Sequence, residues 1–395
     1  MKPSSMVLPM MMVTIIYYLA IVGLTTGDDY SSQFYNQALD SANPDSVWPP
    51  SSDNGEQQSF KYPFSFAHRS LYSAGWARQV NVNDLPIAKN MAGVQMKLIA
   101  GGIREMHWHV SDEWAYVIEG HCRVTIVSPE AKGHVADIKQ SDLWFFPSGW
   151  AHSIQGIGKD GCFFILTFNQ GDFNDFGTFL LTDYLIHTPH LVTDLNFATT
   201  GRTFARSPKS TLYIFPSQLP GPLDKELAAV AKGTGLTPPI TFDSTKIEPN
   251  VTRTGGSVKI IDRRNFPLTT IASAILTINP GGMREMHWHP NADEWGYLVR
   301  GQARITTFAA NGEARTMDFQ EGDVSYVPRA MGHYIQNTGN TTVTFLEVFP
   351  TPYFADMSLA TWLAHTPEQL VDAHLHTGAK FLDGIYKEKA VFRPL

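Results

Sequence analysis

The sequence is poor in three features that would place it in other classes of protein: charged residues, cysteine and long apolar segments. Charged residues make up 17% of the 395 residues and the formal net charge is −7, which leaves no basic surface for nucleic acid. The two cysteines, Cys122 and Cys162, are too few for a disulfide framework; either they pair within one domain or they are two buried small hydrophobic residues. After Leu24 no window is apolar enough to span a bilayer, so no membrane span is expected in the body of the chain.

The first residues have the pattern of a targeting segment. Lys2 precedes an apolar stretch from Met6 to Leu24, which small and polar residues follow. We expect residues 1–27 to be a cleaved signal peptide, and the mature protein to be secreted without attachment to a membrane. The apolar stretch is close to spanning length, so an uncleaved membrane anchor is the alternative. Asn250 and Asn340 each begin an Asn-x-Thr pattern, which fits glycosylation of a secreted protein.

The abundant residues favour a globular, mostly β protein with two domains. Aromatic residues make up 12%, and the chain contains 31 glycines and 25 prolines, which suits short strands joined by turns. A length of 395 residues exceeds the usual size of one domain. Segments rich in β-branched and aromatic residues, such as 114–118 and 343–349, are expected to be strands. Thr188-Pro189 and Thr366-Pro367 are expected to begin helices, with threonine as the N-cap.

An internal duplication divides the chain. Residues 101–109 read Gly-Gly-Ile-Arg-Glu-Met-His-Trp-His, and residues 281–289 repeat them 180 positions later with one change. Further on, equivalent residues such as His152 and His333 are 181 positions apart, because one residue is inserted in the second copy. A period this long indicates duplicated domains rather than a solenoid. The predicted organisation is a signal peptide at 1–27, an N-terminal arm at 28–67, a first domain at 68–206, a linker at 207–248 and a second domain at 249–395.

Each copy contains a set of residues suited to binding a metal ion. On a strand, His107 and His109 point to the same face because side chains alternate with period two. Glu113 begins the next strand, and a turn before His152 can bring that residue beside the other three. An isolated His-x-His is usually structural, but here the whole set recurs in order as His287, His289, Glu294 and His333. Three imidazoles and one carboxylate leave open positions on an octahedral ion, which suits Mn or Fe better than Zn.

These motifs resemble those of the cupins. Gly101-x5-His107-x-His109-x3-Glu113-x6-Gly120 resembles the first cupin motif, and Pro147-x-Gly149-x2-His152 resembles the second. Two departures are mild: Ser141 stands where glycine is usual, and Gly156 where asparagine is usual. Outside the motifs, the chain is similar to the bicupin oxalate decarboxylases at residues 75–78, 212–215, 220–222, 355–359 and 362–363. The resemblance implies an all-β fold of two tandem cupin barrels (double-stranded β-helix, or jelly-roll) with short helical appendices, assembled as a homo-oligomer.

The resemblance also implies a reaction. The family converts oxalate to formate and carbon dioxide, with one Mn ion in each barrel and dioxygen as a catalytic co-substrate. Arg104 and Arg284, three residues before the first histidine of each set, match an arginine that binds the substrate carboxylate. Asp175 aligns with a lid glutamate that handles the proton and is one methylene shorter. Glu347 matches a carboxylate near the second metal.

The two copies are not interchangeable, because Leu166 stands in the first where Glu347 stands in the second. We therefore expect the first site to turn over. Three alternatives stay open. Oxalate oxidase, giving carbon dioxide and hydrogen peroxide, follows if Asp175 fails to return the proton. A storage bicupin is disfavoured by eight intact ligands, and a bicupin dioxygenase for another small acid by the paired arginines.

Overall fold

The computed structural model describes residues 36–200, 203–231, 239–378, 380–385 and 387–394. The expected signal peptide at 1–27 lies outside these residues. No helix within them is both long enough and apolar enough to cross a membrane. Residues to Pro49 and residues from Pro50 form two units. The described part of the first unit contains the short helices α2 (Gln37–Ala42) and α3 (Pro44–Val47).

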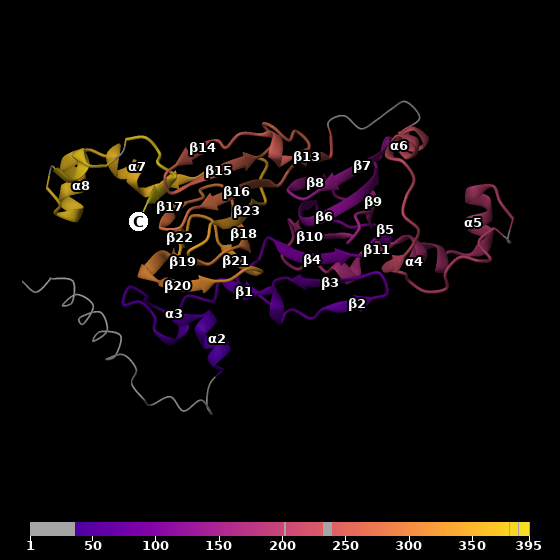
Figure 1. Cartoon of the computed structure of the whole chain (residues 1–395), viewed down its shortest axis with the longest axis horizontal. Coiled ribbons are helices and arrows are strands. Elements are labelled where there is room, and N and C mark those ends of the chain that lie inside the picture. The colour runs from indigo at the N-terminus through magenta and orange to yellow at the C-terminus, as the bar shows by residue number, and fades with distance from the viewer. Residues whose placement is uncertain (1–35, 201–202, 232–238, 379, 386, 395) are drawn as a thin grey trace, which may run out of the picture. The chain divides into compact units, whose positions relative to one another are not determined.

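The second unit contains two β-barrels, which Figure 1 shows as separate groups of strands. In the first barrel, antiparallel strands follow the order β11-β5-β9-β6-β10-β4-β3-β2, with β7 and β8 paired to β6. Its strands are β2 (Ser70–Tyr72), β3 (Gly75–Val80), β4 (Ala92–Leu98), β5 (Gly102–Trp108), β6 (Glu113–Val127), β7 (Gly133–Lys139), β8 (Asp142–Phe146), β9 (Ala151–Gly156), β10 (Cys162–Phe168) and β11 (Phe179–Leu180).

The second barrel repeats this arrangement in two sheets, ordered β1-β21-β18-β23-β16-β15-β14 and β20-β19-β22-β17-β24, where β1 is Lys61–Pro63. Its own strands are β14 (Val251–Arg253), β15 (Gly256–Ile261), β16 (Ala272–Ile278), β17 (Gly282–Trp288), β18 (Glu294–Arg300), β19 (Ala303–Phe308), β20 (Ala314–Phe319), β21 (Asp323–Val327), β22 (Gly332–Asn337), β23 (Val343–Phe349), β24 (Met357–Ser358) and β25 (Phe392–Pro394). The predicted all-β bicupin fold is confirmed.

Each barrel is followed by helices, as the sequence predicts. Figure 1 shows these helical appendices at the outer ends of the two barrels. The expected N-caps were wrong by one residue: Pro189 and Pro367 are the caps, because each keeps an extended backbone with ψ of 138° and 132°. The helices are α4 (Leu181–Ile186), α5 (His190–Phe197), α6 (Leu223–Ala231) in the linker, α7 (Leu359–Ala364), α8 (Glu368–Leu375) and α9 (Lys380–Asp383).

The barrels exchange strands. β1 (Lys61–Pro63), in the predicted N-terminal arm, pairs with β21 of the second barrel. β13 (Thr241–Asp243), in the predicted linker, pairs with β8 of the first. Each barrel has its own apolar core, and a third core with Trp114 and Trp295 contains residues from both. Gly93 is required there, because an added Cβ would lie 2.3 Å from the Trp295 ring.

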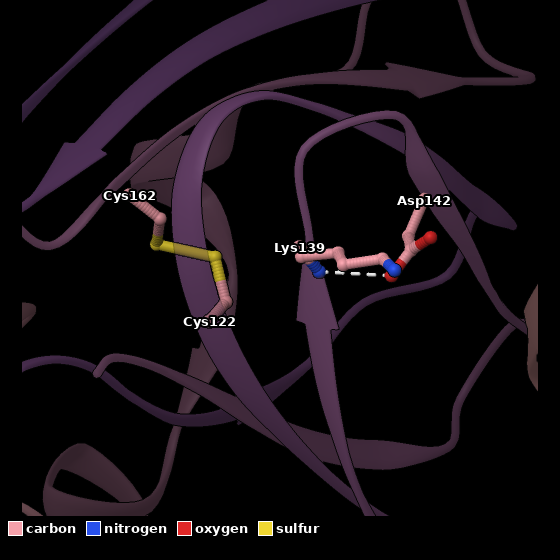
Figure 2. The surroundings of a disulfide bond; sticks show 4 residues. All are labelled: Cys122, Lys139, Asp142 and Cys162. Carbon is pink, nitrogen blue, oxygen red and sulfur yellow. Dashed lines mark hydrogen bonds between the residues drawn. A yellow bond between two sulfur atoms is a disulfide. The ribbon is translucent and has the colours of Figure 1, made fainter. Parts of the chain in front are cut away.

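The two cysteines form a disulfide, which settles the alternatives left open by the sequence. Figure 2 shows Cys122 of β6 bonded to Cys162 of the neighbouring β10, with their Cα atoms 5.8 Å apart. The same figure shows Lys139 N donating a hydrogen bond of 2.9 Å to Asp142 Oδ2 across the β7–β8 turn. Ser141 in this turn has φ of 73°, a left-handed conformation that explains why glycine is usual there.

Candidate metal centres

The first candidate centre lies where β5, β6 and β9 meet. His107 on β5 is in register with His152 on β9, His109 follows β5, and Glu113 begins β6. One possible ligand atom from each residue lies within 4.8 Å of the others. All four side chains are buried. The strands therefore bring the four residues singled out in the first copy to one point inside the barrel.

The second barrel forms an equivalent centre from β17, β18 and β22. His287 is in register with His333, and Glu294 begins β18. The ligand atoms of these residues and His289 also lie within 4.8 Å of one another. The inserted residue lies in the loop between His289 and Glu294, where it leaves the strand positions of the ligands unchanged.

Hydrogen bonds orient all six histidines for metal binding. Each Nδ1 lies 2.6 to 3.0 Å from a backbone carbonyl oxygen. A neutral imidazole that donates from Nδ1 carries a lone pair on Nε2, the atom that faces the centre. His109 Nε2 is 3.1 Å from Glu113 Oε2, and His333 Nε2 is 3.2 Å from Glu294 Oε2. Because acceptors this close repel each other without a cation between them, both centres fit a divalent metal ion.

Burial and nearby charges set the protonation of the first centre. Burial, followed by the Arg104 guanidinium, holds the pKa of His107 well below its ordinary value, so the imidazole is neutral. Burial raises the pKa of Glu113, but positive charge beside it, a proton on His109 or His152 or a cation in its place, outweighs burial and holds that pKa far below its usual range. Trp144 Nε1 donates a 2.7 Å hydrogen bond to Glu113 Oε1. The carboxylate is therefore ionised and held in place.

A β-bulge brings the expected arginines to the inner face. Residues three apart on a regular strand point to opposite faces, so Arg104 would point away from His107. The register between β5 and β9 shifts between these two residues, and the shift recurs between Arg284 and His287 on β17. Arg104 and Arg284 are both buried.

Arg104 has donors without partners inside the protein. Its Nη2 donates to Thr178 Oγ1 at 2.9 Å and to Asp175 Oδ1 at 3.3 Å. The Nε and Nη1 atoms are buried without a hydrogen-bond partner. The Tyr213 ring centroid lies 4.1 Å from the guanidinium carbon, a cation–π contact that fixes its plane. Buried donor nitrogens without partners suit a carboxylate ligand.

Asp175 lies beside this arginine on a loop between β10 and β11. It begins a single 3-10 turn (Asp175–Gly177), and Asn174 Oδ1 caps the turn by accepting a hydrogen bond from Phe176 N. Burial raises the pKa of Asp175, although Arg104 opposes the shift. Its Oδ2 has no partner. Asp175 is therefore a buried acid close to its ion-pair partner.

In the second barrel the equivalent arginine, Arg284, already forms an ion pair with a carboxylate of the protein. Arg284 Nη2 donates to Asp356, which also pairs with Lys389. Asp356 and Thr178 hold equivalent places, because each directly precedes the strand that pairs with the first ligand histidine. Glu347 on β23 is fully buried, and neither carboxylate oxygen has a partner. Burial, followed by the charge of the ligand glutamate, raises the pKa of Glu347 well above its ordinary value.

Sequence reasoning missed two aspartates that precede the ligand glutamates. Asp112 Oδ1 accepts from Ser148 N at 2.8 Å, and its Oδ2 accepts from Thr270 Oγ1 of the other barrel at 2.5 Å. Asp293 accepts from Arg329 N at 2.7 Å and from Asn90 of the other barrel at 2.6 Å. Each aspartate therefore links the loop before its ligand glutamate to the loop before the last ligand histidine of the same barrel. It also links that centre to the other barrel. Their position beside a ligand in both copies was the available signal.

Tyr213 was also missed as a site residue. It precedes β12 (Ile214–Pro216), which pairs with β5 as the C-terminal β25 pairs with β17. Tyr213 and its counterpart Val391 both have positive φ, 55° and 65°. The sequence marked residues 212–215 as family-like, but the cation–π contact of Tyr213 depends on the path of the linker.

The fold and the two centres define a two-domain cupin metalloprotein. The cupin family matches residues 64–202 and 242–381. The oxalate decarboxylase of Bacillus subtilis (strain 168) is 46% identical over 355 residues, which cover 90% of this chain and 91% of the relative. An oxalate decarboxylase of Arthroderma benhamiae is 34% identical over 385 residues, covering 90% and 89%.

A solved structure of the Bacillus subtilis enzyme, studied for its Mn(II) centres, superimposes with a TM-score of 0.89 at 44% identity and covers 92% of this chain and 96% of that one. The chain belongs to the bicupin oxalate decarboxylase family.

Proposed function

We propose that the protein is a manganese-dependent oxalate decarboxylase that converts oxalate to formate and carbon dioxide at the centre in the first barrel. The observation that carries this proposal is the position of Arg104 near the first centre, with two donor nitrogens that lack partners and the buried acid Asp175 beside it. Relatives named as oxalate decarboxylases, similar over nine-tenths of the chain, support the same substrate.

The four ligands of the first centre would hold Mn, which would supply one-electron chemistry to bound oxalate with dioxygen as co-substrate. Arg104 binds one substrate carboxylate through a guanidinium nitrogen that lacks a protein partner and stabilises the charge that develops there. Asp175 holds the proton and returns it to the carbon that is retained. The hydrogen oxalate anion thus gives one carbon dioxide and one formate: the carbon–carbon bond breaks and a carbon–hydrogen bond forms. Dioxygen is not consumed.

We propose that the second centre supports structure or electron transfer rather than main turnover. Arg284 is paired with Asp356, whose pKa is lowered, whereas Arg104 is paired with Asp175, whose pKa is raised, so the ion pair of the second barrel is the one that stays fully charged. Glu347, whose pKa is raised by burial and by the charge of Glu294, stands at the position of Leu166, so the second centre has a buried carboxyl group that the first lacks.

One incubation tests the proposal against its main rival. Purified protein loaded with Mn and supplied with oxalate should release formate with little hydrogen peroxide. An oxidase would give hydrogen peroxide with two carbon dioxide molecules for each oxalate. If the metal-loaded protein consumes no oxalate, both enzyme activities are refuted and a storage protein is favoured.

We also propose that the protein is secreted and glycosylated. The disulfide between Cys122 and Cys162 supports an oxidising compartment. Asn250 and Asn340 are exposed, as a glycosylation site must be. Sequencing of the secreted chain should find an N-terminus near Asp28, and glycosidase treatment should lower its mass. An uncleaved chain in the membrane fraction would contradict secretion.

Finally, we propose a homo-oligomer. α5 and α8 expose large apolar side chains that water would otherwise contact: Leu191, Leu195, Leu370 and Leu375. Light scattering should give a mass that is a multiple of the chain mass, and a monomer at micromolar concentration would contradict the proposal.

A further inference from the structure

Substrate reaches the first centre only if part of the protein moves. Arg104 is 0% exposed and Asp175 is 2% exposed, so oxalate in solution has no direct contact with either. The segment from Asn169 to Thr178 connects β10 to β11, carries Asp175, and has only the single 3-10 turn as regular structure. This segment, which we call the lid, therefore must open for Arg104 to bind a substrate.

Three neighbouring residues at the end of β3 contact the lid. Val82 N donates to Gly171 O at 2.8 Å, and Asn81 Nδ2 donates to Phe173 O at 3.1 Å. Gln79 makes two further contacts at the 3-10 turn itself. Its Oε1 accepts a 2.9 Å hydrogen bond from Asp175 N, and its Nε2 donates to Asn174 Oδ1 at 3.3 Å.

The second barrel has a hydrogen bond equivalent to that of Val82 but lacks the contact made by Gln79. Arg263 N donates to Pro352 O at 2.9 Å, as Val82 does to Gly171 in the first barrel. The fifth residue of β15 is Ile260, whereas the fifth residue of the equivalent β3 is Gln79. An isoleucine side chain neither donates nor accepts a hydrogen bond. The glutamine contact therefore belongs to the barrel whose arginine has two nitrogens without partners, Nε and Nη1, whereas Arg284 has one, Nε.

We propose that Gln79 is a positioning residue that latches the lid closed and holds Asp175 against Arg104 during the reaction. β3 is fixed by its pairing with β4 along all six residues, so Gln79 stands on a rigid element and its hydrogen-bond partners lie on the segment that must open. The latch consists of two hydrogen bonds, weak enough to break when substrate enters. Its effect on the products rests on the proposed decarboxylase function, whereas its effect on the lid does not.

The test compares Gln79→Leu with Gln155→Leu in hydrogen–deuterium exchange of the metal-free protein. Gln155 is a half-buried glutamine of the same barrel, and it donates to Gly101 O and Gln218 O rather than to the lid. The Gly177 amide is the reporter, because it donates to Asn174 O within the lid and does not touch Gln79. Losing a hydrogen bond worth about 1 kcal/mol should speed its exchange roughly fivefold or more in Gln79→Leu. Gln155→Leu should leave it unchanged.

The second measurement is the ratio of formate to hydrogen peroxide in the Mn-loaded variants. Gln79→Leu should raise the peroxide fraction, because Asp175 is held near Arg104 for less time, and metal content should stay at the parent level. Unchanged exchange at Gly177 would overturn the latch. Faster exchange with an unchanged product ratio would overturn its role in the reaction. If the parent protein makes no formate, the proposed function fails while the exchange measurement still decides the latch.

Discussion

Replacing Arg104 with lysine should remove most of the turnover while leaving both metal centres filled. Two buried guanidinium nitrogens of Arg104, Nε and Nη1, lack partners, and the Tyr213 ring fixes the plane of the group. Lysine keeps the charge but loses the fork that binds both oxygens of a carboxylate. Contacts of this kind to a developing charge are worth about 2 to 4 kcal/mol, so kcat/KM for oxalate should fall roughly 30- to 1000-fold.

The assay is steady-state formate production, with Mn content and the thermal unfolding midpoint measured on the same samples. Arg284→Lys is the matched control, because its guanidinium donates to Asp356. It should lower stability, since the buried ion pair changes, and alter kcat/KM by no more than about threefold. A value for Arg104→Lys within about threefold of the parent, at full Mn content, would show that Arg104 does not bind substrate.

The remaining predictions concern the metal, the acid and an ion pair. His107→Ala should lower the Mn content from two ions to one per chain by elemental analysis; loss of both would show that the centres are coupled. Asp175→Ala should lower formate and raise the peroxide fraction, whereas Asp175→Glu should make formate at least as fast; a parent-like product ratio in both would identify Asp175 as an ordinary loop residue. Asp356→Asn leaves Arg284 and Lys389 without a carboxylate and should lower the free energy of unfolding at neutral pH by about 3 kcal/mol in denaturant titrations. Arg284 and Lys389 outweigh burial and lower the pKa of Asp356 from 3.8 to about 2, so about 2 kcal/mol of stability is present above pH 3.8 and is lost as pH falls toward 2. Asp356→Asn should lack that loss, and equal acid sensitivity in both proteins would contradict it.

The barrels and the ligand sets were predictable because their signals are local and occur twice. His107 and His109 follow the alternation of a strand, and the same letters return as residues 281–289. The prediction that Arg104 lies near the metal rested on its position three residues before His107 in the sequence. Strict alternation would place it on the wrong face, and only the bulge in β5 shows how it turns inward.

Contacts between distant segments were not predictable. β1 pairs with β21, more than 250 residues away, over only three residues, which is too short for an alternating pattern to indicate a partner. The ion pair of Arg284 with Asp356 and Lys389 depends on the chain after the last helix returning to β17. Such contacts follow from the path of the chain rather than from any single motif.

Carbon-13 NMR of doubly labelled oxalate, followed during turnover by the Mn-loaded protein, tests the central claim most directly. We expect labelled formate and labelled carbon dioxide to appear in a one-to-one ratio as oxalate disappears. Formation of carbon dioxide alone, at two molecules for each oxalate, or no loss of oxalate with both metal centres filled, would contradict the assignment of this chain as an oxalate decarboxylase.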